Sequence, residues 1–144
     1  MLEQQNTKRG FNVKQVIFAA LLFMMLGTSL ELYLIHHYED TQQLIPLLCI
    51  AIAILGVFIL FYKRTKQTFK IFKFILIITA LSGVYGIFLH LQVNFEFEKE
   101  MTPTATNWEL CIESLSGALP ALAPASMIVL ALIGYAYLLL LKQK

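Results

Sequence analysis

The side chains best suited to chemistry in this sequence are one acid and three histidines near the ends of apolar segments. Glu31 falls inside an apolar run that His36 and His37 close, and His90 ends another such run. An ionisable side chain within an apolar segment is a site hypothesis by default, because burial penalises its charged form unless a partner is present. We therefore expect a hydrogen bond between Glu31 and His90, which are the residues to carry protons or cations if the protein transports them.

The same side chains are the candidates for a metal site. Imidazole and carboxylate ligands suit zinc, manganese or iron, and the sequence supplies both kinds at Glu31, His36, His37 and His90. Their spacing follows no known metal motif. In the simpler interpretation Glu31 reaches the lipid headgroups and His90 belongs to a polar cluster, so we expect no cofactor.

Sequence patterns of enzyme active sites are absent. There is no G-x-S-x-G, Walker, H-E-x-x-H or C-x-x-C motif, and nothing nominates a catalytic nucleophile with its base. Cys49 and Cys111 leave two possibilities open, a disulfide or two separate thiols. The sequence therefore favours a non-enzymatic protein.

The elements that position these residues are membrane spans. Of the 144 residues 58% are hydrophobic and 14% charged, against about 45–50% and about 25% in soluble domains. A helix that crosses the hydrocarbon core needs about 20 mostly apolar residues. Because short connections make neighbouring spans antiparallel, we expect one all-α domain, a four-helix up-down-up-down bundle. Its spans are about 15–36, 44–62, 71–91 and 118–141.

Lysine and arginine near the span ends predict the orientation. Ten of the eleven lie on one side, in the N-terminal arm, at the C-terminus and around the second connection, and only Lys99 lies opposite. Eight of the nine acids lie on the other side, which gives about +9 inside and −7 outside. Both termini are thus expected in the cytoplasm, with the lipid bilayer of the inner membrane as the main partner. The sequence has no basic patch interleaved with aromatic residues, so we expect no nucleic-acid binding.

The outer loop, residues 92–117, contains one helix signal. Thr106 followed by Glu109 fits a capping box. Trp108, Cys111 and Leu115 then share one helical face. We expect a short amphipathic helix before the fourth span that packs on top of the bundle through this face, with Trp108 at headgroup level.

Small and proline residues mark where the spans pack. On the third span Thr79, Gly83, Gly86 and His90 recur at steps of three and four, a seam that lets another backbone approach. The fourth span carries Pro120 and Pro124, and each proline removes a backbone donor. These prolines predict a kinked fourth helix.

Two stretches of sequence resemble a family of small bacterial four-span integral membrane proteins without assigned function. They are His37-Tyr38-Glu39-Asp40 with Gln42-Gln43-Leu44-Ile45-Pro46, and Trp108-Glu109-Leu110 with Gly117-Ala118-Leu119-Pro120-Ala121-Leu122-Ala123-Pro124. The resemblance implies a bacterial inner membrane and brings no activity, cofactor or partner with it.

Taken with the absence of enzyme motifs, this pattern favours an accessory protein or complex subunit. Such a protein would contact another membrane protein or a second copy of itself. The alternative is a small transporter or an ion- or proton-binding protein that uses Glu31 and His90.

The charge asymmetry generates a test of topology. In a cysteine-free background, Lys66→Cys and Glu98→Cys should react oppositely with a membrane-impermeant thiol reagent applied to intact cells. Position 98 should label and position 66 should label only after the membrane is opened. Labelling of position 66 from outside would contradict the orientation.

Overall fold

The computed structural model describes residues 12–143, which form five helices and, within that range, no strand. Four of the helices are long and apolar enough to cross a membrane, which fits a multi-pass membrane protein. The all-helical class is therefore confirmed, whereas the basic arm at Lys8 and Arg9 lies outside the described residues. The helices are α1 (Val13–Leu34), α2 (Thr41–Tyr62), α3 (Lys66–Met101), α4 (Asn107–Ser114) and α5 (Ala125–Lys142).

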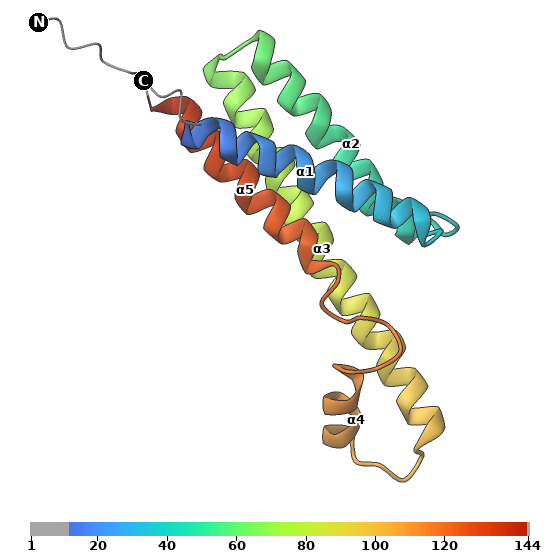
Figure 1. Cartoon of the computed structure of the whole chain (residues 1–144). Coiled ribbons are helices and arrows are strands. Elements are labelled where there is room, and N and C mark those ends of the chain that lie inside the picture. Colours follow the sequence, from blue (N-terminus) through green and yellow to red (C-terminus); the bar gives the residue numbers. More distant parts are fainter. Residues whose placement is uncertain (1–11, 144) are drawn as a thin grey trace, which may run out of the picture.

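Helix α3 is the central element of the structure. It packs against α2, α4 and α5, while α1 packs against α5 and α2 (Figure 1). The ring of Phe18 lies 5.2 Å from those of Phe61 and Tyr137, so the start of α1 lies beside the ends of α2 and α5. The connection between α2 and α3 is only three residues long, and the Thr68 hydroxyl closes it by donating to the carbonyl of Lys63 at 2.7 Å.

Glycines bring the long helices into close contact. A Cβ atom at Gly56 of α2 would lie 2.7 Å from the ring of Phe72 in α3. One at Gly134 of α5 would lie 2.6 Å from the side chain of Leu76, also in α3. Helices in lipid associate through such tight packing, because acyl chains are as apolar as the side chains they would replace.

The third helix is longer than the sequence predicts. A span of 71–91 was expected, but α3 ends at Met101 and covers about 54 Å at 1.5 Å per residue. No glycine or proline interrupts residues 92–101. Gln92 donates to Glu96 one turn later at 3.0 Å, which stabilises the polar part of the helix. The first ten residues of the predicted outer loop are therefore a helical continuation of the third span.

The start of the fourth span also differs from the prediction. Residues 115–124 are not helical, and α5 begins at Ala125 with Pro124 as its N-cap. Pro120 and Pro124 thus precede the helix, and the predicted kink within it is wrong. The reason is their packing on α3, where a Cβ atom at Gly86 would lie 2.8 Å from the Pro124 ring.

A single buried amide fixes this non-helical stretch to α3. The Asn94 side chain is 1% exposed. Its Nδ2 donates to the carbonyls of Ser114 and Leu119 at 2.9 and 2.8 Å, and its Oδ1 accepts from the Leu119 amide at 2.9 Å. Gly117 permits this approach, because a Cβ atom there would lie 2.6 Å from Asn94 Cγ.

Helix α4 has the predicted cap but buries a different face. Thr106 is its N-cap, and hydrogen bonds from the Thr106 backbone and hydroxyl hold the pKa of Glu109 below its ordinary value. Leu110 and Ser114 are the buried residues of this helix. The predicted contact face is wrong, since α4 packs on α3 and the Ser114 carbonyl bonds Asn94. The expected contact residues Trp108, Cys111 and Leu115 are all exposed.

Asn94 generates a stability prediction. Asn94→Ala leaves two carbonyls and one amide without their partner, which should cost about 2–4 kcal/mol and lower the melting temperature in detergent. Gln92→Ala removes an exposed hydrogen bond two residues away and serves as the control, with little expected effect. Equal melting temperatures for the two variants would contradict the role of Asn94.

Candidate functional site

Two of the predicted site residues meet at the turn between α1 and α2. The rings of His37 and His90 lie edge to face, with centroids 6.3 Å apart, and both residues are partly buried. His90 Nδ1 donates to the carbonyl of Pro120 at 3.0 Å, because a carbonyl oxygen can only accept. The histidine pair is thus tied to the non-helical stretch before α5.

The backbone separates the two adjacent histidines of this turn. His36 has a φ of 55°, in the left-handed region that few residues other than glycine adopt. Its ring is hydrogen-bonded to the Tyr38 hydroxyl at 2.8 Å, and Tyr38 in turn stacks on Tyr33 at 5.8 Å. His36 therefore belongs to an exposed aromatic group, whereas His37 faces α3.

The predicted bond between Glu31 and His90 is not formed. Glu31 is exposed on α1, and His90 bonds Pro120 instead. The physical reason is that α1 packs against α5 and α2, whereas His90 lies on α3. The expected pair is therefore wrong.

The metal candidates and the cysteines also lie apart. In residues 12–143 no three His, Cys, Asp or Glu side chains gather into a group that could hold a metal ion. Of Glu31, His36, His37 and His90, only His37 and His90 are brought together. Cys49, buried in α2, and Cys111, exposed on α4, are free thiols.

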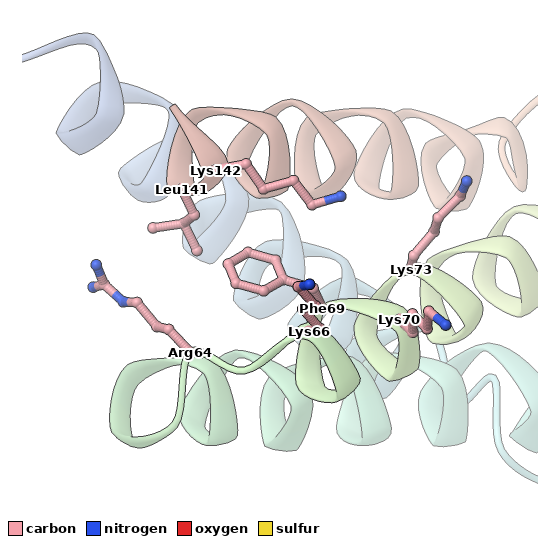
Figure 2. A pocket seen from close by; sticks show the side chains of 7 residues that line it. All are labelled: Arg64, Lys66, Phe69, Lys70, Lys73, Leu141 and Lys142. Atoms are coloured by element: carbon pink, nitrogen blue, oxygen red, sulfur yellow. The ribbon is translucent and has the colours of Figure 1, made fainter. Parts of the chain in front are cut away.

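An open groove lies at the opposite end of the molecule, between the start of α3 and the end of α5. This basic groove has a volume of about 560 Å³. Figure 2 shows the ring of Phe69 between the two helices, with basic side chains around it. Among residues 12–143, none of those that line it is acidic. The lining comprises the cations Arg64, Lys66, Lys70, Lys73 and Lys142 and the apolar residues Phe69 and Leu141.

Helical spacing gathers three of these cations on α3. Lys66, Lys70 and Lys73 follow one another at steps of four and three, which places them on one face of α3. Two ammonium groups also lie over aromatic rings, an arrangement that attracts a cation to the ring face. Lys142 Nζ is 5.7 Å from the centre of the Phe69 ring, and Lys73 Nζ is 5.8 Å from that of Tyr135.

In the sequence these lysines predict only the orientation, and the groove was not predicted. Their helical spacing was the available signal, but the facing wall comes from α5, some 70 residues away along the chain. Asn94, which lies four residues after His90 on the same seam of α3, was not predicted either.

No protein-family model, no curated protein and no solved structure matches this chain. The resemblance to small bacterial four-span proteins therefore stays a prediction, and the function is argued from the geometry alone.

The histidine pair generates a pH prediction. Burial, and then the neighbouring charge of His90, lower the pKa of His37 from its ordinary value of 6.5. The folded protein thus disfavours protonated His37, so stability is full above pH 6.5 and falls as the pH drops through that value. Melting temperatures in detergent should decrease between about pH 8 and about pH 5.5.

The matched variants for that experiment are adjacent in sequence. His37→Gln should flatten the pH dependence, whereas His36→Gln removes the ring that bonds Tyr38 and should leave it unchanged. Parallel pH curves for both variants would show that the pair plays no part.

Proposed function

We propose that the protein is a multi-pass inner-membrane protein that serves as a non-enzymatic accessory factor or complex subunit. Its four spans run up-down-up-down with both termini in the cytoplasm. The contacts of Phe18 with Phe61 and Tyr137 support this arrangement, because they join the start of α1 to the ends of α2 and α5. The basic groove lies at the same end, which supports a cytoplasmic location.

The observation that carries the role as a subunit is the uncovered face of α1. Only 11% of its apolar window is buried. Phe23 is 76% exposed, and Gly27 and Glu31 follow it one and two turns later on the same face. A Cβ atom at Gly27 would meet no atom of residues 12–143 within 4 Å.

This face fits another helix better than it fits lipid. A carboxylate that faces acyl chains raises the free energy of the membrane-embedded protein, and a partner with a hydrogen-bond donor would relieve it. Gly27, one turn before Glu31, leaves room for a neighbouring backbone to approach. We infer that a helix of another membrane protein, or of a second copy of this chain, covers α1.

The second function suggested by the sequence was a transporter or ion-binding protein with a Glu31–His90 site. The geometry gives it less support, because the two side chains are not paired and His90 bonds the Pro120 carbonyl. Glu31 is therefore better explained as part of a contact between proteins.

Photo-crosslinking in living cells tests this proposal. The photoreactive residue p-benzoylphenylalanine should replace Phe23 of α1 or, as the control, Phe74 of α3, which is 64% exposed. We expect a protein–protein adduct from position 23 but not from position 74. Mass spectrometry of the adduct then separates a second copy from another protein.

Glu31→Leu completes the experiment. Loss of the carboxylate should lower the yield of the adduct from position 23 if the partner recognises it. Failure of position 23 to form any adduct above the level at position 74 would contradict the subunit role.

A further inference from the structure

The basic groove brings together five cations, and no acidic side chain of the described lining offsets their mutual repulsion. Lys66 and Lys70 are one helical turn apart on α3, and like charges at this spacing destabilise a helix. Lys142 and Arg64 add charge from α5 and from the connection before α3. A bound anion would remove this repulsion.

The cations extend along the groove. Arg64 and Lys66 stand at the rim, where α3 begins, and Lys142 is the last residue of α5. Lys70 and Lys73 lie four and seven residues after Lys66 on α3, about 6 and about 10 Å along the helix axis at 1.5 Å per residue. Cations spread over about 10 Å suit a ligand with two separated anionic groups better than a single phosphate.

The rest of the lining is apolar. The partly exposed ring of Phe69 lies between the two helices and offers this apolar surface, whereas Leu141 of α5 is already buried (Figure 2). A soluble phosphate compound gains nothing from such a surface, whereas the first carbons of an acyl chain would bury apolar area against it. Basic pockets between membrane helices on the cytoplasmic side are suited to phosphorylated lipid headgroups.

We propose that the basic groove binds one phospholipid of the cytoplasmic leaflet whose headgroup carries two phosphates. Lys66, Arg64 and Lys142 hold one phosphate at the rim, and Lys70 and Lys73 hold the other. The partly exposed ring of Phe69 contacts the acyl chains. This inference rests on the proposed orientation, in which the groove faces the cytoplasm.

The competing explanation is that these lysines only direct membrane insertion. Orientation depends on the number of basic residues near a span end and not on where their side chains point. A site depends on their positions. Lys14 and Lys63 lie outside the lining of the groove, so replacing both removes the same charge as replacing two groove lysines and serves as the control.

The experiment measures lipid binding to the purified full-length protein in mild detergent by native mass spectrometry. The probes are cardiolipin, which has two phosphates, phosphatidylglycerol, which has one, and phosphatidylcholine, which has no net charge. We expect one bound cardiolipin per chain, at an affinity at least about fivefold above that of phosphatidylglycerol, since each added charge contact contributes about that factor.

The variants separate position from charge count. Lys70→Gln with Lys73→Gln should weaken cardiolipin binding about thirtyfold, and Lys14→Gln with Lys63→Gln, which removes equal charge, less than about twofold. Equal losses in the two double variants would overturn the site. Equal affinities for cardiolipin and phosphatidylglycerol would overturn the two-phosphate headgroup.

A further arm identifies the source of the phosphate. Inorganic pyrophosphate should not displace cardiolipin at equal concentration, and displacement would make the ligand a soluble phosphate compound and overturn the lipid. This experiment does not depend on the subunit role. If cardiolipin does not bind while positions 66 and 98 label as expected, the lipid site is overturned and the orientation stands. Reversed labelling overturns the orientation proposed above.

Discussion

The hydrogen bonds of the buried Asn94 amide are the interaction on which the rest of the structure depends. Ten residues before α5 are not helical, and backbone groups buried next to α3 need partners. One asparagine side chain supplies a donor for two carbonyls and an acceptor for the Leu119 amide. With this stretch fixed, α5 starts at Ala125, and its 18 residues extend about 27 Å back toward the start of α3. The basic groove exists because that return brings Lys142 opposite the lysines of α3.

The same face of α3 explains why the predicted polar site did not form. Gly83 and Gly86 receive Pro124, His90 donates to the Pro120 carbonyl, and Asn94 binds Leu119. From Gly83 to Asn94 the seam is thus occupied by residues 114–128, and His90 is committed to backbone. Glu31 remains on a helix that does not pack against this face, which is why we interpret it as a contact to another protein.

What the sequence could predict follows from local physics, and what it missed depends on distant contacts. Apolar length predicted four helices, and the Thr106–Glu109 pair predicted the start of α4, because both signals lie within one element. The buried face of α4 and the start of α5 depend on Asn94, about 20 and about 30 residues earlier in the chain. Prolines within an apolar run predict a kinked helix, because no local signal shows that packing against a neighbouring helix keeps them outside the span.

The attachment of residues 115–124 to α3 is the central claim, and hydrogen exchange of the Leu119 amide in lipid nanodiscs tests it most directly. The exchange rate should be measured residue by residue in the wild type and in Asn94→Ala. We predict slow exchange of this amide in the wild type and fast exchange in the variant, with the exposed Thr104, in the turn before α4, fast in both. Fast exchange of the Leu119 amide in the wild type would contradict the account.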